Sequence, residues 1–191
     1  DRGLRFCAGP VSKAGASRPA STNRKTDTEN IEHPMRHTIS VLVENKFGVL
    51  TRVSGLFSGR GYNIDSLNVA PTHDATLSRM TIVTRGDDAT VEQICMQLEK
   101  LIDSVKIVNY SKTDYIDREL GLVRVSANGQ NRAEICQLAE LFRAKVVNVQ
   151  PDNIVIEITG AETKINQFLL LVKDFGILDL TRTGVVALPR N

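Results

Sequence analysis

The chain has 191 residues, 41% of them hydrophobic, which is enough for two small domains or one of ordinary size. Residues 1–25 hold six Lys or Arg against one Asp, whereas residues 26–191 hold 18 basic and 21 acidic side chains, a balance that excludes generic binding of nucleic acid. The three cysteines lack the paired spacing of zinc or redox motifs, and no apolar run approaches the roughly 20 residues of a membrane span.

Residues 1–34 show no sustained hydrophobic period and are rich in Ser, Ala, Arg, Gly and Pro. A basic, acid-poor leader of this kind resembles an organellar transit peptide or its remnant, and the alternative is a disordered tail. We therefore expect the protein in the plastid (chloroplast) if residues 1–34 are a transit peptide, and in the cytoplasm otherwise.

The elements expected after the leader follow the order βαββαβ. In chain order they are a strand over 38–44, a helix over 49–57, strands over 62–70 and 77–85, a helix over 91–102 and a strand over 105–110. The apolar phase of the second strand slips between Ile64 and Leu67, which predicts a β-bulge near Asp65.

A second βαββαβ unit follows, after a segment over 112–118 that we expect to be a linker and a hinge. It comprises a strand over 120–127, a helix over 135–142, strands over 144–149 and 154–159, a helix over 165–172 and an extended piece over 176–188. The fold class is therefore α+β, with two ferredoxin-like units, each an antiparallel sheet with two helices on one face. Because units this small bury little surface, we expect pairing between chains or between repeats.

A candidate binding site lies where the first helix begins. Gly48 precedes the apolar stripe of this helix, and Gly59 and Gly61 follow it. The first amides of a helix have no partner within it and carry partial positive charge, and a glycine there allows a small anion to come close to the backbone. This loop is suited to hold a carboxylate.

Residues arranged for catalysis or for metal binding do not stand out. His33, His37 and His73 are scattered, and the glycines around 48–61 match neither a P-loop nor a dinucleotide fingerprint. An RNA-recognition module has the same βαββαβ order, but it stacks bases on aromatic side chains that the corresponding strands, 37–43 and 77–84, lack. These observations favour a module that binds a small molecule or a protein.

Three runs, 36–45, 48–67 and 70–82, closely resemble the regulatory (small) subunit of acetolactate synthase, also called acetohydroxyacid synthase. The resemblance continues through 117–120, 142–147 and 182–188, and it covers about residues 35–190. Two positions depart from the pattern. Phe47 stands where a small or polar residue is common, and Gly121 stands where a larger apolar residue is usual.

The resemblance implies an ACT domain over 35–111, the linker over 112–118 and a C-terminal ferredoxin-like domain over 119–191. Such subunits have no catalytic activity. They bind the catalytic (large) subunit, which holds thiamine diphosphate, FAD and magnesium, they raise its activity, and they confer feedback inhibition by valine or a related branched-chain amino acid. No cofactor is then expected in this chain itself, and the ACT domain is expected to form a homodimer.

The resemblance and the helix-start argument together predict six residues of an effector site for the amino acid: Asn45, Gly48, Val49, Leu50, Asn63 and Ile64. The amides near Gly48 would take the carboxylate, and Asn63 of a second chain would offer its oxygen to the ammonium or its NH₂ to the carboxylate. Asn45 would order the loop or contact the ligand, while Ile64 or Leu50 would line a pocket for the branched side chain. A free-standing amino-acid sensor acting on a different enzyme is the alternative function.

Overall fold

The computed structural model describes residues 35–190. Residues 1–34, on which the predictions of a leader and of the location depend, lie outside the described residues. Within the described part, no helix is long and apolar enough to cross a membrane.

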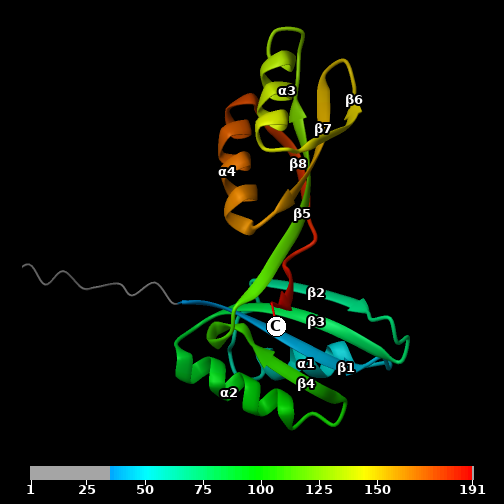
Figure 1. Cartoon of the computed structure of the whole chain (residues 1–191), viewed down its shortest axis with the longest axis vertical. Helices are drawn as coiled ribbons and strands as arrows, with labels where there is room; N and C mark the ends of the chain where they lie inside the picture. The colour runs from blue at the N-terminus through cyan, green and yellow to red at the C-terminus, as the bar shows by residue number, and fades with distance from the viewer. Residues whose placement is uncertain (1–34, 191) are drawn as a thin grey trace, which may run out of the picture. The chain divides into compact units, whose positions relative to one another are not determined.

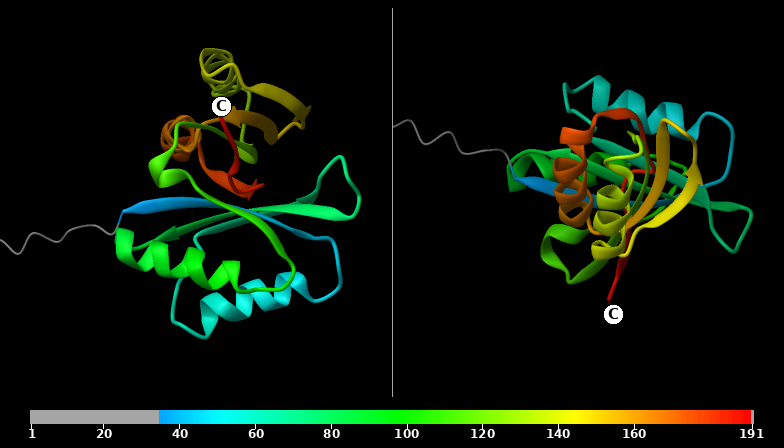
Figure 2. Two further views of the ribbon diagram at one scale, coloured as in Figure 1. Left: turned by 60° about the horizontal axis from the view of Figure 1, so that its bottom comes forward. Right: turned by 90° about the horizontal axis from the view of Figure 1, so that it is seen from above.

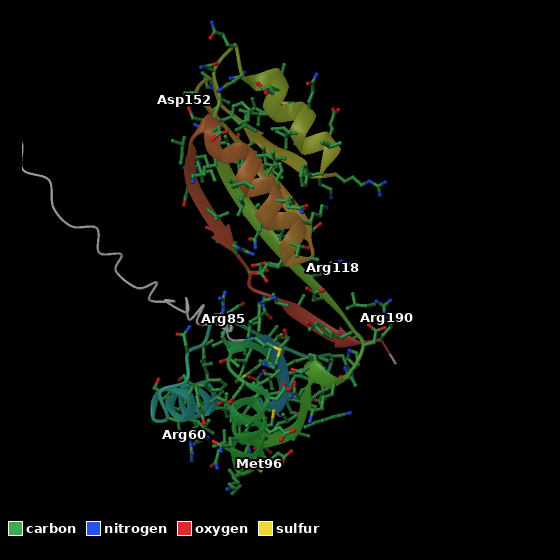
Figure 3. All side chains as sticks on the ribbon, turned by 90° about the vertical axis from the view of Figure 1, so that its left-hand side faces the viewer. Arg60, Arg85, Met96, Arg118, Asp152 and Arg190 are labelled. Carbon is green, nitrogen blue, oxygen red and sulfur yellow. The ribbon has the colours of Figure 1, made fainter. Side chains whose placement is uncertain are left out.

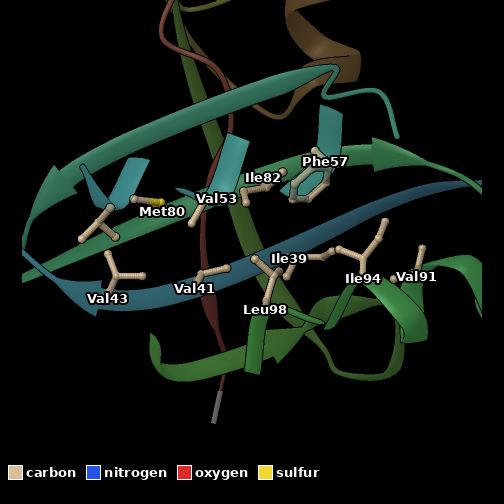
Figure 4. Packing of buried hydrophobic residues seen from close by; sticks show 11 residues of the cluster. Ile39, Val41, Val43, Val53, Phe57, Met80, Ile82, Val91, Ile94 and Leu98 are labelled. Atoms are coloured by element: carbon tan, nitrogen blue, oxygen red, sulfur yellow. The ribbon is translucent and has the colours of Figure 1, made fainter. Parts of the chain in front are cut away.

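The first repeat is a four-stranded antiparallel sheet with two helices on one face (Figure 1). Its elements are β1 (Arg36–Glu44), α1 (Val49–Ser58), β2 (Ser66–Pro71), β3 (Leu77–Arg85), α2 (Asp88–Glu99) and β4 (Ser104–Asn109). The strands stand in the order β2-β3-β1-β4. Alternate residues of β1, Ile39 and Val41 among them, point to the helices and meet Val53 and Phe57 of α1 in a fully buried core (Figure 4).

The second repeat follows a 3-10 turn, η1 (Tyr110–Lys112), and has the same plan. Its elements are β5 (Tyr115–Ser126), α3 (Arg132–Leu141), β6 (Lys145–Val149), β7 (Asn153–Gly160), α4 (Glu162–Val172), η2 (Lys173–Phe175), β8 (Ile177–Arg182) and β9 (Val186–Pro189). The sheet order is β6-β7-β5-β8, and its own buried core includes Val123, Ile156 and Phe168. The prediction of an α+β fold with two βαββαβ units is confirmed.

Two local expectations are wrong. The segment expected as a linker is strand from Tyr115 onward, because β9 returns along the chain and pairs with residues 115–118 in antiparallel register. No bulge occurs near Asp65, since β2 begins only at Ser66 and keeps regular register with β3. Ile64 therefore precedes the strand, and its apolar phase does not have to match that of Leu67.

The ribbon formed by β9 and the start of β5 lies on the sheet face of the first repeat that is opposite α1 and α2 (Figure 2). Val185 and Ala187 pack there against Val83 and Tyr110, and the ring of Tyr110 stacks on that of Tyr115 with centroids 4.8 Å apart. A third small core thus joins the first repeat to the C-terminal residues of the described chain.

Candidate functional site

The loop before α1 ends at Gly48, whose backbone is left-handed with φ 81° and ψ −6°. A side chain here would be strained, so the position requires glycine. No side chain caps the first turn of α1, and that turn holds no acidic residue. The Val49 amide donates only a long bond, 3.5 Å, to the Lys46 carbonyl. The start of α1 therefore keeps amide donors and partial positive charge for an anion.

Asn45 ties this loop to the loop between β2 and β3. Its side-chain Nδ2 donates to the Ala75 carbonyl at 2.9 Å, and its backbone N–H donates to the Thr76 carbonyl at 2.7 Å. These bonds place Asn45 in the role of ordering the loop that ends at Gly48.

Asn63 lies in the segment after α1, and its exposed side chain is oriented by its neighbours. Its Nδ2 donates to Asp65 Oδ1 at 2.7 Å, while Asp65 Oδ2 accepts from Arg85 Nε at 2.6 Å. Thr84 Oγ1 donates to the Asn63 backbone carbonyl at 2.6 Å. With Nδ2 engaged, the Asn63 side-chain oxygen is the atom left without a hydrogen bond among residues 35–190.

The three apolar residues of the predicted site differ in what their side chains can contact. Val49 is only 3% exposed and belongs to the core, so it can offer a ligand its backbone alone. Ile64 is half-buried and packs against that core, whereas Leu50 is 45% exposed. Leu50 and Ile64 are therefore the two that can present apolar atoms to a bound side chain.

The two halves of the predicted site do not meet within one chain. Gly48 precedes α1 and Asn63 follows it, and a helix of ten residues is about 15 Å long. A carboxylate held at Gly48 would be far from the Asn63 amide of the same molecule. A single ligand can contact both only if a second copy of the chain brings its own Asn63 to the start of α1.

Asn63 and Ile64 also line a cleft of about 600 Å³, which Asn45, Gly48, Val49 and Leu50 do not reach. Sequence reasoning missed the charged residues that surround this cleft. They form three ion pairs, Arg36 with Glu162 at 2.5 Å, Arg85 with Asp65 at 2.6 Å, and Arg182 with Glu119 at 2.5 Å. No local sequence pattern predicts these ion pairs, because most of the partners lie far apart along the chain.

The ion pair of Arg182 and Glu119 is bidentate, and of its two side chains that of Glu119 is buried. Arg182 donates through Nε to Oε1 and through Nη2 to Oε2, and its Nη1 donates to Asn166. The hydrogen bonds that Arg182 donates to the Glu119 carboxylate raise the pKa of Arg182 above its ordinary value. Among the residues that the structure describes, no cluster of three His, Cys, Asp or Glu side chains is placed to hold a metal ion.

The fold of the first repeat and its helix-start loop define an ACT-type module, and residues 39–106 match the family model described as the AHAS small subunit-like ACT domain. Residues 118–191 match the model described as the small subunit of acetolactate synthase. The chain belongs to the family of acetolactate synthase small subunits.

Its relatives agree with that assignment. The chain is 51% identical over 157 residues to the probable acetolactate synthase small subunit of Archaeoglobus fulgidus, covering 82% of this chain and 98% of the relative. It is 45% identical over 158 residues to the isozyme 3 small subunit of Escherichia coli strain K12, covering 82% and 97%. The crystal structure of the small subunit from Thermotoga maritima matches with a TM-score of 0.75 and 38% identity, covering 82% of this chain and 98% of that one.

Proposed function

We propose that this chain is the regulatory subunit of an acetolactate synthase, that it binds and activates the catalytic subunit, and that it makes the enzyme sensitive to feedback by valine. Membership of the small-subunit family supports the partnership. The observation that carries the effector role is the uncapped start of α1 behind the left-handed Gly48, combined with an exposed, oriented Asn63.

In the proposed complex, the amino-acid carboxylate lies at the first amides of α1 of one chain. The ammonium group donates to the side-chain oxygen of Asn63 of the second chain. The hydrogen bond from Asn63 Nδ2 to Asp65 favours this arrangement over the one in which the NH₂ group meets the carboxylate. The branched side chain then lies against Leu50 and Ile64, the two apolar residues with accessible atoms.

A site shared by two chains links ligand binding to assembly. An amino acid that binds the pair better than the separated chains stabilises the pair by that difference in free energy. We propose that valine shifts the arrangement of the ACT pair and that this shift lowers the activity of the attached catalytic subunit. Thiamine diphosphate, FAD and magnesium belong to the catalytic subunit in this proposal. We also propose that the protein works in the plastid if residues 1–34 are a transit peptide, and in the cytoplasm otherwise.

The test is calorimetric titration of valine into the chain, with leucine, isoleucine and serine as comparisons, while the oligomeric state is followed. Asn63→Ala removes a hydrogen bond to a charged group, so we expect a loss of affinity of about 10- to 150-fold. Activation of the catalytic subunit should stay near the wild-type value. Asn148→Ala, which changes an exposed asparagine of β6, is the matched control and should bind valine normally.

Valine affinity unchanged in Asn63→Ala would remove Asn63 from the site. A chain that binds valine but neither associates with nor activates the catalytic subunit would support the alternative of a free-standing sensor for another enzyme. Turnover of pyruvate by the purified chain alone would contradict a purely regulatory role.

A further inference from the structure

A groove lies on the outer face of the first sheet, between the β2–β3 hairpin and the ribbon formed by β9 and the start of β5. Its volume is about 520 Å³. The ribbon contributes three exposed apolar side chains, of which Ile116 is 41%, Val186 44% and Leu188 58% exposed. The groove therefore offers apolar surface that nothing in residues 35–190 covers.

Cations surround this apolar surface. Arg79 and Arg118 line the groove, and Lys106 lines a smaller hollow that shares Arg79 and Leu188 with it. None of the three cations has a carboxylate within 4.0 Å among residues 35–190. Arg118, labelled on β5 in Figure 3, donates within the described part of the chain only to the backbone carbonyl of Asp117.

Arg79 is the most informative of these cations. It is half-buried on β3, opposite Leu42 of β1 on one side and Ala70 of β2 on the other. A partly desolvated charge among apolar neighbours costs free energy unless a partner of opposite sign compensates it. Arg79 can thus pair with a carboxylate of a bound ligand. Apolar side chains of the same ligand would cover Ile116 and Leu188.

Two occupants from this chain itself fit poorly. Residues 1–34 hold six Lys or Arg against four Asp or Glu, so that segment carries the same sign of charge as the groove. A second copy docked through the same groove would form a self-complementary contact and bring Arg79 and Arg118 of both copies together. Like charges so placed oppose association.

We infer that this groove, which we call the Arg79–Arg118 groove, is the docking surface for an acidic and apolar segment of the catalytic subunit. The inference rests on the proposed function, because it takes the catalytic subunit as the partner. Carboxylates of the segment pair with Arg79 and Arg118, and its apolar side chains cover the exposed face of the β5–β9 ribbon. This surface is distinct from the loop at Gly48 and from Asn63.

The first experiment titrates the full chain into the catalytic subunit of the organism that encodes it, and measures the concentration that gives half-maximal activation. In the double variant Arg79→Glu/Arg118→Glu this concentration should rise at least about tenfold, and it should depend less on salt than that of the wild type. Arg124→Glu is the matched control. Arg124 lies on the same strand and the same face as Arg118, roughly 20 Å away, and should leave activation unchanged.

The outcomes separate the two proposals. If the wild-type chain neither binds nor activates the catalytic subunit, the proposed function fails. If the wild type activates and the double variant activates equally well, only the docking surface is wrong. A circular dichroism spectrum and a valine affinity like those of the wild type are required of each variant, so that a failure to fold is not read as a failure to dock.

A carbodiimide supplies a second, independent test, because it joins a lysine to a carboxylate with which it is in direct contact. In the complex, Lys106 should be joined to an Asp or Glu of the catalytic subunit, and Lys106→Gln should remove that link. A Lys106 link found only to a second copy of this chain would overturn the inference, as would a complex in which Lys106 forms no link while lysines away from the groove do.

Discussion

The bidentate pair of Arg182 and Glu119 allows a quantitative test of how this chain is held together. The Glu119 side chain is 4% exposed and the Arg182 side chain 29%. Arg182→Met leaves the buried carboxylate without its partner, a change that costs about 3–5 kcal/mol for a fully buried pair. Because Arg182 is partly exposed, we expect a loss of about 3 kcal/mol, toward the low end of that range.

The reverse change should cost less. Glu119→Gln removes the negative charge opposite the guanidinium but keeps one acceptor oxygen, and the guanidinium can also turn toward water, whereas the Glu119 carboxylate cannot. The double variant should lose less than the sum of the two single variants, with a coupling energy of about 1.5–3 kcal/mol. The asymmetry follows from the two exposures alone.

The assay is urea denaturation of the wild type, both single variants and the double variant, followed by far-ultraviolet circular dichroism. When residues 35–190 unfold together, a loss of about 3 kcal/mol corresponds to a melting temperature lower by about 6–12 °C. Arg182→Lys, which keeps the charge but not the two parallel hydrogen bonds, should fall between Arg182→Met and the wild type. Equal losses in Arg182→Met and Glu119→Gln, or losses that simply add, would refute the reasoning.

Three further changes give effects of known sign. Gly121→Ala should raise the free energy of unfolding by about 0.4–1 kcal/mol in the same assay, because its Cβ meets Ile158 at an ordinary 3.5 Å and the unfolded chain loses freedom. Gly184→Ala should lower it by about 1–3 kcal/mol, since φ is +75° and the Cβ comes within 2.5 Å of Ser66 Oγ; no loss would contradict this. Hydrogen bonds from Thr90 hold the pKa of Asp87, the N-cap of α2, below its ordinary 3.8, so its stabilising effect is present above pH 3.8 and lost as the pH falls further. Asp87→Ser should therefore weaken the acid dependence of unfolding, and identical pH profiles would refute it.

The helix and sheet core of the first repeat was predictable because its signals are local. The spacing of Val49, Leu50, Val53, Leu56 and Phe57 predicts one buried helix face. Val49, Val53 and Phe57 are buried and Leu56 packs partly buried against the core, whereas Leu50 is 45% exposed. Gly48 was placed at the start of the helix and Gly59 and Gly61 at its end. Gly48 and Gly61 have positive φ, whereas Gly59, the C-cap, is right-handed with φ −66°. Such positions depend on nearest neighbours, which a sequence shows directly.

The start of β5 was not predictable in the same way. The run Asp114–Arg118 has three charged residues around Tyr115 and Ile116, without the alternation that predicts a strand, and its strand partner β9 lies in another part of the chain. The partners of the ion pairs around Asn63 are equally remote, Arg36 and Glu162 above all. The hydrophobic pattern also could not separate two roles of Val49. Its side chain is buried in the core, and its backbone amide lies at the loop before α1.

The small core of Val83, Tyr110, Val185 and Ala187 has a consequence for synthesis on the ribosome. Roughly 75 residues separate Tyr110 from Val185, and at about 5–20 residues per second they take about 4–15 s to be made. During that time the outer face of the first sheet lacks the strand that covers it. The nascent chain then presents Val83 and Tyr110 to other nascent chains and to chaperones, and the return of β9 ends that exposure.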